Sequence, residues 1–198
     1  VLTNSDLEKL VDTSDEWIKS RVGINKRHVV SDGEASSDMS TKVAHSLLEK
    51  RGISAANIDV IIIGTVTPDH PTPSTAAIVQ NNINAENAWA FDLSAACSGF
   101  LYALETGAKF IESGHYKTIM VIGVDTMTSI LDFEDRETCI IFGDGAGGVI
   151  LEASKSNTGI LGSVLKTDGS GAESLNVLAG GSKYPASLTT IKNRQHYI

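Results

Sequence analysis

One cysteine stands where the chain could supply a nucleophile. Cys97 lies in DLSAACSGF, between an expected strand that ends near Leu93 and a long expected helix. The first N–H groups of a helix lack partners, and with the helix dipole they favour an anion such as a thiolate. A cysteine is also common as an inert core residue, so both interpretations stay open. Room for a thioester to approach the sulfur is left by its small neighbours, Ala95, Ala96, Ser98 and Gly99.

The second cysteine gives a contrasting pattern. Cys139 lies inside the apolar run CIIF, where we expect a small core residue. The two cysteines are 42 positions apart (139 − 97) and neither belongs to a CxxC pair. This spacing supports neither a disulfide framework nor a structural zinc site, so we expect no metal and a reducing, cytoplasmic setting.

A glycine-rich segment, FGDGAGG, matches the dinucleotide fingerprint G-x-G-x-x-G at Gly143, Gly145 and Gly148. The fingerprint requires a helix directly after the glycines to hold a pyrophosphate. Here the glycines are followed by the apolar residues Val149, Ile150 and Leu151, of which the first two are β-branched, and this favours a strand. We therefore expect a glycine turn between two strands and no bound dinucleotide.

The elements that must position these residues follow from apolar periodicity and caps. Helices are expected over two short stretches of 4–22, capped by Asn4 and Ser14, and over 37–51, 75–83 and 94–113. Strands are expected over 59–66, 88–93, 118–124 and 139–142 with 148–151. This alternation predicts an α/β fold with a mainly parallel sheet covered by helices. We expect one half-domain over 1–165 and a loop-rich segment over 166–198.

Composition narrows the class of protein. The 198 residues are 41% hydrophobic and carry 16 Lys plus Arg against 24 Asp plus Glu, a net charge of −8. This balance argues against a nucleic-acid partner, since no excess of cations is available for phosphates. The longest apolar stretch, 60–66, is far shorter than the ~20 residues of a membrane-spanning helix, so no membrane association is expected.

Four segments together resemble one family. LTNSDLEKLVDTSDEWIKSRVGI, AACSGF, DFEDRETCIIFGDGAG and TDGSG occur in the order and at the spacing of β-ketoacyl-acyl-carrier-protein synthase III, a condensing enzyme of the thiolase-like superfamily. The resemblance implies a thiolase-like fold, a homodimer and the initiating step of bacterial fatty acid synthesis. It implies acyl-coenzyme A and malonyl-acyl carrier protein as partners, and no cofactor beyond the coenzyme A thioester substrate.

The resemblance also implies roles for particular residues. Cys97 matches the nucleophile that takes an acyl group from coenzyme A. Trp17 and Arg136 correspond to the pair that sandwiches the adenine of coenzyme A, Arg21 to a residue near its phosphates, and Thr13 to a polar contact. Trp17 and Arg21 are i, i+4 neighbours, so one helical face could offer stacking and charge. Without the family, a core Trp17 and a solvated Arg21 would be the simpler interpretation.

The sequence also departs from the family pattern. Thr72 stands where relatives often place a Phe that lines the partner's acyl pocket, so the primer chain length is left open. The family's catalytic His and Asn belong to a second half, and none of the five histidines matches that His: His28, His45, His70, His115 and His196. We therefore expect the N-terminal half of a longer enzyme, without the first strand, that alone performs at most the acyl-acceptor step.

Two other functions remain open at this stage. A hydroxymethylglutaryl-coenzyme A synthase or a thiolase could use a similar cysteine, and a coenzyme A acceptor would distinguish it. Alternatively, the chain could be a non-catalytic module that keeps only the core and the dimer surface.

Docking of an acidic carrier protein to a chain of net charge −8 would require a local basic patch.

Overall fold

The structure is a computed structural model that describes residues 1–156 and 158–198. The chain divides into two compact units, and each is described by itself. The sheet unit comprises Val30–Asp125 and Gly145–Leu165. The terminal unit comprises Val1–Val29, Thr126–Asp144 and Lys166–Ile198.

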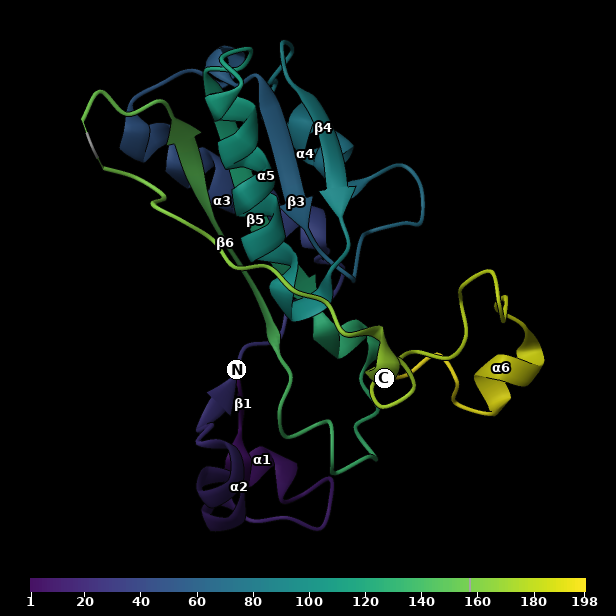
Figure 1. Ribbon diagram of the computed structural model, residues 1–198. Helices are drawn as coiled ribbons and strands as arrows, with labels where there is room; N and C mark the ends of the chain where they lie inside the picture. Colours follow the sequence, from purple (N-terminus) through teal and green to yellow (C-terminus); the bar gives the residue numbers. More distant parts are fainter. Residues whose placement is uncertain (157) are drawn as a thin grey trace. The chain divides into compact units, whose positions relative to one another are not determined.

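The sheet unit is built on four strands in the order β4-β3-β5-β6 (Figure 1). Strand β3 pairs in parallel with both β4 and β5, so that Val60 lies opposite Trp89 on one side and Ile119 on the other. The arrow of β6 points opposite to those of β3 and β4 in Figure 1. The prediction of a mainly parallel sheet is thus confirmed. The strand bounds are β3 Val60–Gly64, β4 Trp89–Leu93, β5 Thr118–Thr126 and β6 Asp144–Glu152.

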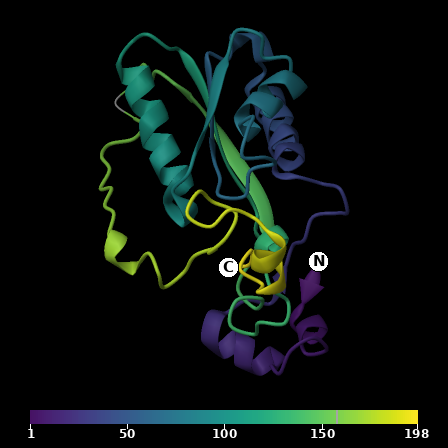
Figure 2. The ribbon, with the colours of Figure 1, turned by 90° about the vertical axis from the view of Figure 1, so that its right-hand side faces the viewer.

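Helices cover both faces of this sheet (Figure 2). Successive side chains of a strand point to opposite faces, so Ile61 and Ile63 pack among residues of α3 and α4, whereas Val60 and Ile62 pack beside Ala103 of α5. All five side chains are fully buried. This alternation explains why the strand is apolar throughout. The elements of this layer are α3 Ser36–Arg51, η1 Ala55–Asn57, α4 Thr75–Asn82, η2 Ala96–Ser98 and α5 Gly99–Glu112.

The terminal unit gathers short elements around its own core. Its buried residues are Leu7, Ile18, Leu131, Cys139 and Ile140. Burial raises the pKa of the Cys139 thiol, which fits the small core residue expected from the sequence. The elements are β1 Leu2–Thr3, α1 Asn4–Leu7, α2 Asp15–Val22, β2 Lys26–Arg27, η3 Met127–Ile130, η4 Gly169–Gly171 and α6 Leu188–Lys192.

The caps of the first two helices differ from expectation at one residue. Ser14 caps α2 as predicted, because its hydroxyl accepts the N–H of Trp17 at 3.1 Å. Thr3, rather than Asn4, caps α1 by accepting the N–H of Asp6 at 3.2 Å. The Asn4 side chain instead donates to Asp15 Oδ1 at 2.8 Å and is buried.

Two predictions about the glycine-rich segment are wrong. The expected strand at 139–142 is a series of turns, in which the N–H of Cys139 bonds to Asp135 O at 3.1 Å. The expected glycine turn is absent, because Gly145 to Gly148 belong to β6. A Cβ at Gly148 would lie 2.7 Å from Val121 O, so this glycine serves close approach of two strands. The segment continues as a strand, and the helix of the dinucleotide fingerprint does not follow it.

Within the described ranges, no helix is both long and apolar enough to cross a lipid bilayer.

Candidate active site

Cys97 lies in η2, the single turn that connects β4 to α5. Its side chain is exposed, in contrast to the fully buried Cys139. The turn is closed by the N–H of Ser98, which bonds to Ala95 O at 3.1 Å. The expected helix therefore starts later than residue 94, at Gly99, and the thiol sits two residues before it. The predicted location at the strand–helix junction is confirmed.

The start of α5 is fixed by contacts that only glycine permits. A Cβ at Gly64, the last residue of β3, would lie 2.8 Å from the carbonyl carbon of Gly99. A Cβ at Gly123 of β5 would lie 3.1 Å from Phe100 Cβ. The contact at Gly64 leaves no room for a Cβ and the contact at Gly123 is tight, so β3 and β5 pack directly on the first turn of the helix. These contacts set the position of Gly99 and Phe100, which come two and three residues after Cys97.

The residue before the thiol has an unusual backbone. Ala96 has a φ of +46°, in the left-handed region that residues with a Cβ rarely adopt. Such a conformation costs of order 1 kcal/mol and persists only where surrounding structure imposes it. Cys97 is therefore exposed in a turn that has a strained backbone on one side and the tightly packed Gly99 on the other.

The terminal unit brings three of the predicted residues together. Trp17 and Arg21 are one turn apart on α2, and Arg21 Cζ lies 5.9 Å from the centroid of the indole ring. Arg136, from the turns after β5, places its Cζ 5.1 Å from the same centroid. Both separations are within the range of cation–π attraction. This stacking cluster of Trp17, Arg21 and Arg136 presents an aromatic face with two cations.

Asp12 contacts the stacking cluster, and Thr13 follows Asp12 in the chain. The Nη1 group of Arg136 donates to Asp12 O at 3.1 Å, and its separation from Asp12 Oδ2 is 3.5 Å. The hydroxyl of Thr13 is buried, and within the described part of the chain it has no hydrogen-bond partner. The sequence indicates Thr13 as a candidate but gives no sign of Asp12. No local pattern could have indicated Asp12, because its partner lies 124 positions away.

A hollow of 500 Å³ opens at the carboxyl ends of β3 and β4. It is lined by the turn that follows β3, including His70 and Ser74, and by Asp92 and Ser94. Asp92 accepts the N–H of Thr75 at 2.7 Å, and burial raises the pKa of its carboxyl group. Asp92 thereby fixes the start of α4 and the turn before it, which contains Thr72.

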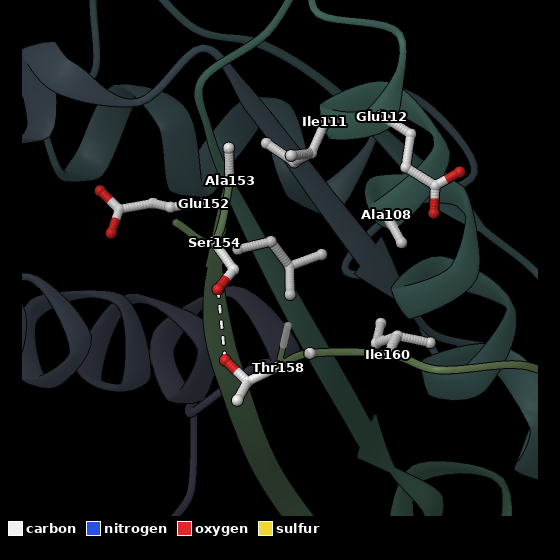
Figure 3. A pocket seen from close by; sticks show the side chains of 10 residues that line it. Ala108, Ile111, Glu112, Glu152, Ala153, Ser154, Thr158 and Ile160 are labelled. Atoms are coloured by element: carbon white, nitrogen blue, oxygen red, sulfur yellow. Dashed lines mark hydrogen bonds between the residues drawn. The ribbon is translucent and has the colours of Figure 1, made fainter. Parts of the chain in front are cut away.

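A second pocket of 320 Å³ lies at the other end of α5 (Figure 3). Its walls are mainly apolar. The hydroxyl groups of Ser154 and Thr158 are hydrogen-bonded at 3.2 Å, and Figure 3 marks this bond with a dashed line. Its two carboxylates already have partners, Glu112 with Lys109 and Glu152 with Arg51, each at 2.8 Å. The 14 residues of α5 span about 21 Å, so this pocket is remote from Cys97. We assign no chemistry to it.

Among the residues with a described placement, no group of three or more His, Cys, Asp or Glu side chains could hold a metal ion.

The chain is similar to known proteins of one kind, in sequence and in structure. Residues 91–169, which include Cys97 and Arg136, match the family model of 3-oxoacyl-[acyl-carrier-protein] synthase III. A β-ketoacyl-[acyl-carrier-protein] synthase III of Chlorobaculum tepidum is 57% identical over 201 residues, covering 100% of this chain and 61% of that protein. The chain thus spans less than two thirds of the length of this relative.

Solved structures agree with the sequence comparison. The 3-oxoacyl-[acyl-carrier-protein] synthase III of Aquifex aeolicus is 47% identical, with a TM-score of 0.76, over 78% of this chain and 50% of that one. The Thermus thermophilus enzyme is 38% identical, with a TM-score of 0.82, over 87% and 53%. The expectation of a thiolase-like α/β fold, matching part of a longer relative, is confirmed. By sequence and by fold, this chain is similar to part of the β-ketoacyl-[acyl-carrier-protein] synthase III proteins.

Proposed function

We propose that Cys97 accepts an acyl group from an acyl-coenzyme A, as the first step of the condensation that begins fatty acid synthesis. The observation that carries this proposal is the exposed thiol in η2, directly ahead of α5 and on a strained backbone. The names of the relatives, β-ketoacyl-[acyl-carrier-protein] synthase III, support the same reaction.

The first step is a thioester exchange. The Cys97 thiolate attacks the carbonyl carbon of the acyl-coenzyme A and forms a new C–S bond. The bond to the coenzyme A sulfur breaks, and coenzyme A leaves as a thiolate that takes up a proton. A covalent acyl-enzyme divides the overall condensation into two easier halves.

The stacking cluster is suited to the adenine of coenzyme A. A flat ring stacked between two planes at about 3.5 Å from each requires a gap of roughly 7 Å. Arg136 Cζ now lies 5.1 Å from the Trp17 centroid, so Arg136 must move outward to admit the ring. The exposed Arg21 would then face the phosphates, and the unpartnered hydroxyl of Thr13 would bond to a polar atom of the nucleotide.

The second step uses malonyl-acyl carrier protein. Loss of CO₂ from the malonyl group produces a carbanion that attacks the acyl-Cys97 carbonyl and releases the thiolate. In the family this step requires a His and an Asn, and none of these 198 residues matches either of them. Acyl transfer is therefore the step that we assign to this chain. We further propose a cytoplasmic homodimer in which Thr72, smaller than the family's Phe, contributes to the choice of primer.

Incubation with acetyl-coenzyme A is expected to add one acetyl group to the chain. Cys139→Ala should acetylate normally, because that thiol is buried and the pKa of its side chain is raised. Cys97→Ala should not acetylate at all, because the nucleophile is gone. Intact-mass spectrometry reads out all three proteins. Acetylation that persists in Cys97→Ala would exclude the proposal.

Removal of the Trp17 ring is expected to weaken the binding of coenzyme A. Stacking on an aromatic side chain is worth about 1–3 kcal/mol per base, so Trp17→Ala should raise the Kd of coenzyme A about tenfold or more. Trp17→Phe, which keeps a smaller ring, should fall between wild type and Ala. Calorimetric titration measures the three values.

Acetylation of Cys97 by acetyl-pantetheine provides the control for Trp17, because this thioester has no nucleotide. Its rate should be unchanged in both variants. An equal loss with both thioesters would indicate that Trp17 is only a core residue, since it also packs beside Ile18.

A further inference from the structure

The last five residues, Arg194 to Ile198, form a segment, here called the strap, that binds the loop at 131–143, which carries Arg136. We propose that Arg194 is a positioning residue for the coenzyme A site: by binding Asp132 and Glu134 it keeps Arg136 in place beside Trp17. This inference rests on the proposed function and adds to it a residue more than 50 positions along the chain from the site. All residues involved belong to the terminal unit.

Arg194 of the strap forms a bidentate ion pair with Asp132 of the loop. Arg194 Nε donates to Asp132 Oδ2 at 2.8 Å, and its Nη2 group donates to Asp132 Oδ1. Arg194 Nη1 lies 3.1 Å from Glu134 Oε2. Two parallel N–H···O bonds fix the carboxylate in orientation as well as in distance. One guanidinium thus anchors two carboxylates of the same loop.

Other contacts hold the strap itself in place. The N–H of Ile198 bonds to Ile130 O at 2.9 Å, and the Ile198 side chain packs in the same apolar cluster as Leu131 and Phe133. Arg194 Cζ lies 5.4 Å from the Tyr197 ring centroid. The backbone of Arg194 has a φ of +58°, a conformation that costs of order 1 kcal/mol for a residue with a Cβ. Several contacts therefore fix where the guanidinium points.

The loop transmits this constraint to the stacking cluster over a short distance. The N–H of Asp135 bonds to Asp132 O at 3.1 Å, and Asp135 in turn accepts the N–H of Glu137 at 2.9 Å. Arg136 lies between these two bonded residues. When the loop loses its anchor it samples more conformations, and the fraction in which Arg136 can stack on an adenine ring held against Trp17 falls. Apparent affinity falls by the same fraction.

A role in general stability would have a different signature. If Arg194 only stabilised the unit, its loss would affect every reaction of the protein to the same extent. If it positions Arg136, the loss affects ligands that contain a nucleotide and spares those that lack one. Coenzyme A and acetyl-pantetheine separate the two cases, because only the former reaches the stacking cluster.

The test compares variants that remove or keep the bidentate ion pair between Arg194 and Asp132. Arg194→Gln removes the charge, and we expect the Kd of coenzyme A to rise about fivefold, the scale of a well-formed surface ion pair. Arg194→Lys keeps the charge but cannot form two parallel hydrogen bonds, so the Kd of coenzyme A should rise less. Lys192→Gln removes a cation two residues earlier that forms no ion pair within the described ranges, and it should bind as wild type.

The rate of Cys97 acetylation by acetyl-pantetheine should be the same in all four proteins. An unchanged Kd of coenzyme A in Arg194→Gln overturns the inference, and so does an equal loss with acetyl-pantetheine. Should Arg194→Gln fail to fold, Arg194→Lys carries the same comparison. If the wild-type chain binds no coenzyme A, the proposed function falls and this inference falls with it; if wild type binds and the variants bind equally, only the inference falls.

Discussion

Replacement of Gly64 by alanine is expected to lower the free energy of unfolding by about 1–3 kcal/mol and to slow the acetylation of Cys97. The added methyl carbon would lie 2.8 Å from the carbonyl carbon of Gly99 and 3.0 Å from the amide nitrogen of Phe100. Both neighbours are backbone atoms, which cannot rotate away as the end of a side chain can. The first turn of α5 must therefore move, and Cys97 moves with it.

Gly147→Ala is the matched control for Gly64→Ala. Gly147 also lies in a strand, β6, and a Cβ there would meet nothing within 4 Å. Urea unfolding gives the stability of each variant, and intact-mass spectrometry after timed incubation with acetyl-coenzyme A gives the acetylation rate. The interpretation would be wrong if the two variants lost stability equally, or if Gly64→Ala were acetylated as fast as wild type.

Replacement of Arg27 by methionine is expected to lower the free energy of unfolding by about 3 kcal/mol, the scale of two lost charge-assisted hydrogen bonds. Arg27 is only 4% exposed, and burial lowers the pKa of its guanidinium. Its Nε donates to Ile140 O at 2.9 Å and its Nη1 group donates to Asn4 Oδ1. Methionine fills much of the volume but leaves both oxygens without these donors.

Lys26→Met controls for the loss of a cation from β2, because Lys26 is the exposed neighbour of Arg27. Its stability should change by less than about 0.5 kcal/mol, as is usual for surface substitutions. Thermal and urea unfolding of both variants provide the comparison. Equal stability of Arg27→Met and wild type would show that the buried guanidinium is not required by this core, as is true of some buried ion pairs replaced by apolar residues.

The two wrong predictions about the glycine-rich segment have separate physical causes. The apolar residues after the glycines of FGDGAGG favour a strand, and a turn between two strands is the local expectation for the glycines. In the structure, Gly148 is required because Val121 O of the neighbouring strand lies 2.7 Å from where its Cβ would be. Local sequence carries no record of such a neighbour. The series of turns at 136–141 was likewise hidden, because an apolar run such as CIIF suits a buried turn as well as a strand.

The division of the chain at residue 165 stays a prediction.

The sequence by itself determined the α/β class, the parallel strands β3, β4 and β5, and the junction that holds Cys97. These features depend on short-range patterns of apolar residues, caps and small side chains, which act within a few residues. Only the tertiary structure decided that Arg194 binds Asp132, 62 positions away (194 − 132). The pairing of Arg136 with Trp17, 119 positions apart (136 − 17), was implied by the family resemblance, and the structure supplies its geometry. Contacts of this kind arise when the chain folds back on itself, so no local pattern encodes which two residues will meet.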